Sequence, residues 1–93
     1  MKLQSNNVWA AIEDNSVLAE NLRLRSQLMM AISDYVKQSG LTHAKAAAKL
    51  GTTQPRLNDV LNGHIDKCTV DRLVNMLASI GFRISMQIDH ELC

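Results

Sequence analysis

The sequence contains few of the residues that hold very small or secreted domains together. Of its 93 residues one is Trp, one Tyr and one Phe, so aliphatic side chains must form most of the core. The two cysteines, Cys68 and Cys93, are fewer than the roughly four or more of a small domain held by disulfides, and we expect both to be reduced thiols. A chain of this length has room for one hydrophobic core and therefore for one domain.

Long apolar runs are missing as well. No stretch approaches the roughly 20 apolar residues of a membrane-spanning helix, and the start MKLQSNNVW lacks the apolar run of a signal peptide. We therefore expect a cytoplasmic protein with no membrane partner.

Sequence features of catalysis and of cofactor binding are also absent. There is no phosphate-binding glycine loop and no nucleophile elbow, and the carboxylates are scattered along the chain. His64 and Cys68 lie four residues apart, but a structural zinc needs about four ligands and the surrounding sequence supplies no others. The sequence therefore predicts a protein that is not an enzyme and that needs no metal or other cofactor.

The formal net charge is only +1, but the charge is unevenly distributed. A basic middle is compatible with binding a polyanion, although a domain with strong sequence-independent affinity for nucleic acid is usually more basic. The charge alone therefore does not decide the function. Between residues 41 and 67 the charged side chains are Lys45, Lys49, Arg56 and Lys67 against Asp59 and Asp66.

The four glycines divide the chain into helices. Each follows a stretch with helical periodicity, where a left-handed C-terminal cap favours a residue without a β-carbon. The stretch before Gly40 predicts a long amphipathic helix that begins at the capping cluster of residues 14–16. Three further helices are each expected to begin after an N-cap threonine and to end before a glycine: Thr42 and Gly51, Thr53 and Gly63, Thr69 and Gly81.

Beyond the last glycine the periodicity changes from helix to strand. In FRISMQI the apolar residues Phe82, Ile84, Met86 and Ile88 alternate with polar ones, as on a strand with one buried face. A lone strand leaves its backbone N–H and C=O groups unpaired. We expect this strand, residues 82–88, to pair with the same strand of a second subunit and so to form a homodimer; the alternative partner is the stretch NVWAAI.

The second and third predicted helices are only about two turns long, and helices of this length are not stable alone. Ala47 and Gly51 are small enough for these helices to cross closely, while Leu57 and Leu61 supply apolar contacts that fix the crossing angle. Residues 42–62 therefore have the layout of a helix-turn-helix motif.

This motif and its flanks resemble a known group of proteins. LTHAKAAAKLGTTQPRLNDVLNG resembles the core of Xre-type regulators with a lambda-repressor-like domain, and the flanks NVWAAIEDNSVLAENLRLRSQLMMAI and TVDRLVNMLASIGFRISMQI resemble antitoxins of HigBA-like toxin–antitoxin modules. The resemblance covers roughly residues 7 to 88. It implies a mainly α-helical fold: a four- to five-helix lambda-repressor-like DNA-binding domain with a C-terminal β-strand that pairs across a dimer. The expected parts are an N-terminal segment, the helix-turn-helix domain, a dimerisation strand and a C-terminal tail, at residues 1–13, 14–81, 82–88 and 89–93.

In such motifs the second helix enters the major groove and reads base edges with its N-terminal residues. The amide of Gln54 can pair bidentately with an adenine, and Asn58 lies one turn further along the same face with the same chemistry. Pro55 offers an apolar contact to a thymine methyl group. We therefore expect base contacts from Gln54, Pro55 and Asn58; for an arbitrary helix pair, solvated polar residues would be the simpler interpretation.

Phosphate contacts are expected from residues around these positions. The resemblance implies a phosphate-binding residue at the start of the second helix, where such regulators usually carry glutamine and this chain carries His43; Lys45 stands where glutamate is usual and can serve a phosphate. Arg56 can reach a guanine edge or a phosphate, of which we favour the phosphate. The expected set is His43, Lys45, Thr52, Thr53, Arg56, Asn62 and Lys67.

These patterns favour a dimeric, sequence-specific DNA-binding repressor whose partner is double-stranded DNA with a near-palindromic operator. The resemblance implies an antitoxin that autoregulates its operon, together with a small basic toxin of the ribonuclease class. The alternative is a protein-interaction module that neutralises a toxin or joins a larger assembly, with DNA binding secondary.

Overall fold

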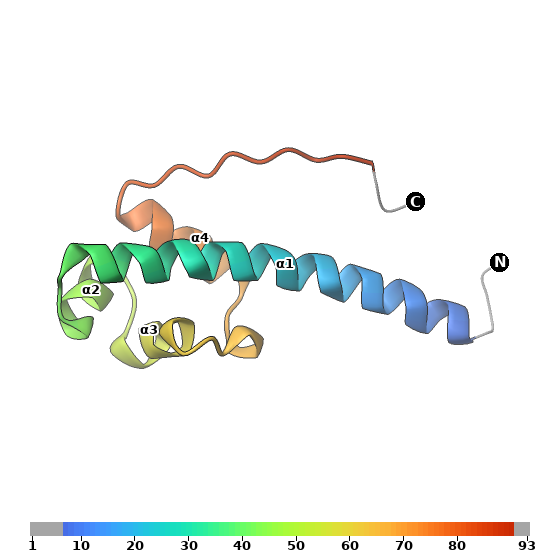
Figure 1. The fold of residues 1–93 in the computed structure, drawn as a ribbon, viewed down its shortest axis with the longest axis horizontal. Helices are drawn as coiled ribbons and strands as arrows, with labels where there is room; N and C mark the ends of the chain where they lie inside the picture. The colour runs from blue at the N-terminus through green and yellow to red at the C-terminus, as the bar shows by residue number, and fades with distance from the viewer. Residues whose placement is uncertain (1–6, 91–93) are drawn as a thin grey trace.

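The computed structural model describes the backbone of residues 7–90 and the side chains from residue 16 to residue 90. Within this range it contains the helices α1 (Asn7–Ser39), α2 (His43–Lys49), α3 (Gln54–Leu61) and α4 (Val70–Ser79) and the 3-10 helix η1 (Ile65–Lys67). Figure 1 shows α2, α3 and α4 gathered around the C-terminal part of α1, whose N-terminal part projects away from them. Because a helix rises about 1.5 Å per residue, the 33 residues of α1 account for most of the 52 Å length of the molecule.

Threonine side chains begin each of the three short helices, as the sequence predicted. The Thr42 Oγ1 atom accepts a hydrogen bond from the backbone N–H of Lys45 at 3.2 Å. Thr53 and Thr69 accept the same bond, each at 3.3 Å, from the third residue of α3 and of α4. These bonds satisfy donors that the first turn of a helix leaves unpaired. The C-terminal end of α1 also follows the prediction, since Gly40 has a φ of 70°, in the left-handed region that favours glycine.

One hydrophobic core holds the helices together. α1 packs against α4 and α3, and α2 packs against α3. Ile32 of α1 and Leu57 of α3 are fully shielded from solvent, and burying a side chain of this size contributes about 1.5–3 kcal/mol. α2 and α3, the two shortest of these α-helices, are therefore held by the core, because helices of this length are marginal alone. The buried residues are Met29, Ile32, Val36, Ala46, Ala47, Leu50, Leu57, Val60, Cys68, Leu73, Met76 and Leu77.

The start of α1 differs from the prediction. The helix begins at Asn7, so residues 14–16 lie inside it and do not form its N-cap. Short polar residues are only mildly unfavourable within a helix, and the good helix formers around them outweigh their capping preference. The stretch NVWAAI is likewise helical, which excludes it as the strand partner of residues 82–88 within this chain. α1 therefore runs across the boundary that was expected between residues 13 and 14.

No β-strand occurs between residues 7 and 90. Residues 82–90 follow α4 without regular secondary structure, and Figure 1 shows them extending in the direction in which α1 projects. At the start of this segment the ring of Phe82 packs edge-on against Tyr35 of α1, with ring centroids 6.2 Å apart. A strand needs a pairing partner, and the described part of a single chain offers none, so pairing across a dimer stays a prediction.

Several apolar side chains of α1 are exposed. Val17 and Leu18 are 69% and 51% exposed, because α2, α3 and α4 cover only the C-terminal part of α1. Met29 is buried, but its neighbour Met30 points outward and is 57% exposed. None of the helices in the described range combines the length and the hydrophobicity that crossing a bilayer requires.

Candidate nucleic-acid interface

The turn between α2 and α3 fixes the two helices of the motif. It is closed by the backbone N–H of Thr52, which donates to the carbonyl oxygen of Ala47 at 3.0 Å. Gly51 has a φ of 68°, and a β-carbon at this position would lie 3.1 Å from the Ser79 Oγ atom of α4. Glycine is therefore favoured twice, by the left-handed backbone and by the close approach of α4. The turn thus holds α3 against α2 and lies itself against Ser79 of α4.

α3 buries one side and leaves the other open to solvent. Leu57 and Val60 point into the core, whereas Gln54 and Pro55 in the first turn are exposed and Asn58 is partly exposed. Neither the Gln54 nor the Asn58 amide forms a hydrogen bond with another residue of the described range. Two amides one turn apart, with free donors and acceptors, have the chemistry that recognises the edges of neighbouring base pairs.

The same surface carries an acidic residue, Asp59, that the sequence did not mark as a site residue. Asp59 lies one turn after Pro55, is partly exposed, and has its Oδ1 atom 3.2 Å from the Nδ1 atom of His64. A carboxylate here can accept a hydrogen bond from the amino group of cytosine, and it repels phosphates nearby. The spacing from Pro55 was visible in the sequence, but the contact with His64 depends on the path of the chain after α3.

The residues expected to bind phosphates are all exposed or partly exposed. One of them already has a structural role, since the Thr53 hydroxyl accepts the N-capping bond of α3. The structure brings two of them, Thr52 and Arg56, into one cleft. The set is distributed over the first turn of α2 (His43, Lys45), the turn before α3 (Thr52, Thr53), α3 and its C-cap (Arg56, Asn62) and the end of η1 (Lys67).

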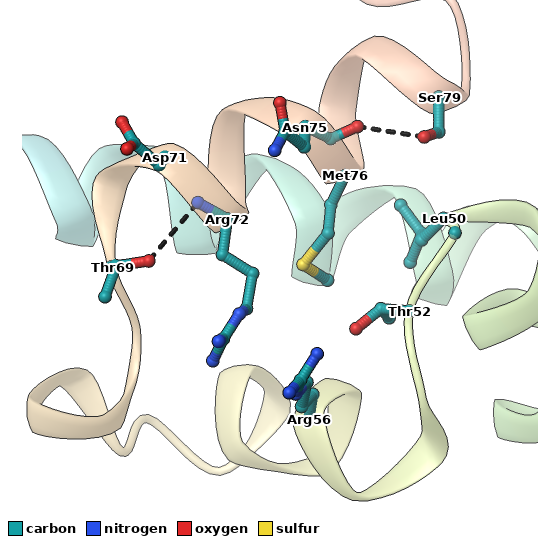
Figure 2. A pocket seen from close by; sticks show the side chains of 10 residues that line it. Leu50, Thr52, Arg56, Thr69, Asp71, Arg72, Asn75, Met76 and Ser79 are labelled. Atoms are coloured by element: carbon teal, nitrogen blue, oxygen red, sulfur yellow. Dashed lines mark hydrogen bonds between the residues drawn. The ribbon is translucent and has the colours of Figure 1, made fainter.

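The cleft has a volume of about 330 Å³ and is lined by the turn between α2 and α3, by α3 and by α4. Figure 2 shows the side chain of Arg72 reaching from α4 toward α3, where Arg56 lines the same cleft. Thr52 lies on the α2–α3 side of it. The sequence does not mark Arg72 as a site residue, because only the packing of α3 and α4 on α1 brings it to the motif.

Cys68 is a core residue. Its thiol is buried and donates a weak hydrogen bond to the carbonyl oxygen of His64, with the two atoms 3.4 Å apart. Burial raises the pKa of the Cys68 thiol above its ordinary value, and the carboxylate of Asp59 acts in the same direction. The thiol is therefore held in its neutral form, which is a poor nucleophile and a poor metal ligand. Across the described residues, no three His, Cys, Asp or Glu side chains gather as a metal site would require.

The fold and this surface define a helix-turn-helix protein. A family described as "Helix-turn-helix domain" matches residues 11–89, and the chain belongs to that family. A solved structure named "Putative XRE Family Transcriptional Regulator" is similar to this chain, with a TM-score of 0.70 and 26% sequence identity over 80% of this chain and 83% of that one. No curated protein matches the chain. The expected likeness to Xre-type regulators is thus confirmed for the fold, while membership of the antitoxin subfamily stays a prediction.

Proposed function

We propose that this chain is a sequence-specific DNA-binding transcription regulator that acts as a repressor. The observation that carries the proposal is the pair of unpaired amides, Gln54 and Asn58, on the open side of α3 in a helix-turn-helix domain. In this fold the second helix of the motif enters the major groove. Gln54 and Asn58 then pair with adenine edges, Pro55 contacts a thymine methyl group, and Asp59 favours a cytosine amino group nearby.

The phosphate contacts give the regulator its register on the duplex. Such contacts carry no sequence information, but they supply much of the affinity and make it fall steeply with salt. The proposed set is the one expected from the sequence: His43, Lys45, Thr52, Thr53, Arg56, Asn62 and Lys67.

The active form that we propose is a homodimer on a near-palindromic operator. Support comes from residues 82–88, whose alternating apolar side chains are exposed in the single chain, with Met86 and Ile88 at 77% and 85%. The backbone of this segment has no strand partner in the described part of the chain. Pairing with the same segment of a second copy would bury the apolar side chains of Phe82, Ile84, Met86 and Ile88 and would give the backbone its hydrogen-bond partners. In such a dimer the two recognition helices are about 34 to 36 Å apart, on successive turns of the major groove.

A finer proposal is that the regulator is an antitoxin that autoregulates its operon with a small basic ribonuclease-type toxin. It rests on the resemblance of the flanking sequences. In addition, α1 has exposed apolar side chains at Val17, Leu18 and Leu24, outside the bundle that its C-terminal part forms with α2, α3 and α4, and they offer a surface for a protein partner. The alternative is a protein-interaction module in which DNA binding is secondary. A neighbouring reading frame for a small basic protein would favour the antitoxin.

Binding to the DNA upstream of the chain's own gene, compared with scrambled DNA, tests the regulator. We expect the double variant Gln54→Ala, Asn58→Ala to lose the preference for the specific DNA, because each bidentate amide–adenine pair contributes about 1 to 3 kcal/mol of discrimination. The matched control is Gln27→Ala, Gln38→Ala, which removes two exposed amides from α1. Equal, weak binding of both DNAs by all three proteins would contradict the regulator and support the interaction module.

A further inference from the structure

The cleft between α3 and α4 is lined by two arginines and one carboxylate. Arg56 and Arg72 line it, and neither guanidinium forms an ion pair or a hydrogen bond with another residue between positions 16 and 90. Asp71 is also near, but Figure 2 shows its carboxylate pointing away from both arginines. Two cations that share a cleft repel each other, and an anion between them turns this repulsion into attraction.

Both arginines stand where a helix prefers a different side chain. Thr53 and Thr69 are N-caps, and Arg56 and Arg72 are the third residues of the helices that follow. A capping box places Glu or Gln at this position, and the positive end of the helix dipole disfavours a cation there. Two such departures lie in one cleft, and departures from local helix preferences gather at functional sites.

We propose that this cleft binds a backbone phosphate of the DNA, held between Arg56 and Arg72 with the Thr52 hydroxyl as a further donor. The inference rests on the proposed function and adds a phosphate ligand, Arg72, to it. A guanidinium offers planar N–H donors that match phosphate oxygens bidentately, which suits a clamp better than two ammonium groups would. Arg56 belongs to the same turn of α3 as Gln54. When Gln54 contacts a base in the major groove, the cleft therefore lies next to the sugar–phosphate backbone of the DNA at the edge of that groove.

A free phosphate-containing molecule offers the same chemistry, and the exposure of the arginines favours the DNA as the source. Arg56 is exposed and Arg72 only partly buried, so both groups can meet the surface of a large ligand. Sites for small molecules usually enclose most of the ligand surface and are largely apolar. Polar and charged side chains dominate the lining of this cleft, in which Leu50 and Met76 are the only large apolar residues.

Arg56→Gln, Arg72→Gln and the double variant test the clamp. Each change completes a capping box with the preceding threonine, so the variants are expected to fold at least as well as the wild type, which thermal unfolding checks. Lys37→Gln, at an exposed position near the end of α1, removes the same charge elsewhere and is the control. Affinity for the operator and for scrambled DNA is measured by fluorescence anisotropy over a series of salt concentrations.

We expect each single variant to lose about tenfold in affinity for both DNAs, and the slope of log affinity against log salt to become shallower by about one. The double variant should lose less than the product of the single losses, because both arginines act on one phosphate. Losses no larger than that of Lys37→Gln, in a chain that still binds its operator, would overturn the clamp and leave the regulator standing.

A wild type that binds no DNA would contradict the regulator itself, and a second measurement then decides about the cleft. Thermal unfolding is followed in inorganic phosphate and in chloride at equal ionic strength. A stabilisation by phosphate that Arg72→Gln abolishes would assign the cleft to a free phosphate ligand and overturn DNA as its source. The absence of any stabilisation would overturn the cleft as a phosphate site.

Discussion

The bundle and the projecting parts of this molecule use similar apolar residues in opposite ways. In the bundle Ile32 and Leu57 are completely buried, whereas Val17 on the projecting part of α1 and Ile88 beyond α4 are 69% and 85% exposed. Apolar surface that remains open on a folded domain commonly marks a contact with another molecule. One copy of the chain therefore buries the apolar side chains of its bundle, while the projecting parts leave theirs exposed, as an interface without its partner does.

The polar surface of the bundle shows a second contrast, between helix preference and charge. All three short helices begin with a capping threonine and carry a basic residue at the third position, namely Lys45, Arg56 and Arg72. Each basic residue makes its helix less stable than an acidic residue would, by about 0.3–1 kcal/mol at low salt, because the N-terminal end of the helix dipole is positive. The starts of α2 and α3 thus present positive charge, as the surface of a DNA-binding protein requires, whereas Asp71 balances Arg72 in the first turn of α4.

Leu57→Ala is expected to have the largest effect on the bundle. The side chain is fully buried, so its truncation should lower the free energy of unfolding by about 2–5 kcal/mol, through lost burial and a residual cavity. Leu24→Ala is the control, because Leu24 is 40% exposed on α1, and it should change stability by less than about 0.5 kcal/mol. Urea denaturation followed by circular dichroism measures both. Equal losses would mean that the two regions form one cooperative core.

Replacing both Met86 and Ile88 by Asp tests the projecting segment. If these side chains line a dimer interface, the two charges should weaken dimerisation roughly a hundredfold, because burying an unpaired charge is unfavourable. Ser85→Asp with Gln87→Asp introduces the same charges at the alternating positions and should have a much smaller effect. Sedimentation velocity gives the dissociation constants. A dimer that persists after truncation at Gly81 would remove residues 82–88 from the interface.

Gly51→Ala and Gly63→Ala separate backbone strain from packing inside the motif. Both glycines have a left-handed φ, 68° and 76°, so each substitution should cost about 1–2 kcal/mol. Only at Gly51 does the added β-carbon meet a neighbour, the Ser79 Oγ atom at 3.1 Å, and we expect a larger loss there. Adding Ser79→Ala should remove that excess. Urea titration measures the free energy of unfolding of each variant. Identical losses at the two glycines would show that Ser79 of α4 moves aside from the added β-carbon at no cost.

The helix limits of the bundle could be predicted because their signals are local. Thr42, Thr53 and Thr69 cap the helices that follow them, and Gly40 ends α1 where the sequence placed the end. The start of α1 could not be predicted in the same way. The polar residues 14–16 suit a cap and also tolerate a helix interior, and the choice depends on the residues before them.

The candidate interface was predictable only in part. Gln54 and Asn58 follow from the periodicity of one helix, and they are open to solvent as that periodicity requires, although their contact with bases stays a prediction. Arg72 could not be selected, because it shares a cleft with Arg56 only when α3 and α4, which are separated in the sequence, both pack on α1. The same limit applies to residues 82–88, whose pairing depends on a second molecule.

Val17→Ala with Leu18→Ala should give the smallest effect and the finest test of the contrast between the two regions. At a concentration at which the chain is monomeric, the free energy of unfolding should stay within about 0.5 kcal/mol of the wild type, because both side chains are exposed and alanine favours the helix. At concentrations that favour a dimer, the same variant should unfold at a lower temperature than the wild type if the projecting part of α1 belongs to the interface, since binding to the folded state stabilises it by mass action. Differential scanning fluorimetry over a range of concentrations makes the comparison. A clear loss at the lowest concentration would mean that these side chains pack within their own chain, and the interface would then be limited to the segment beyond α4.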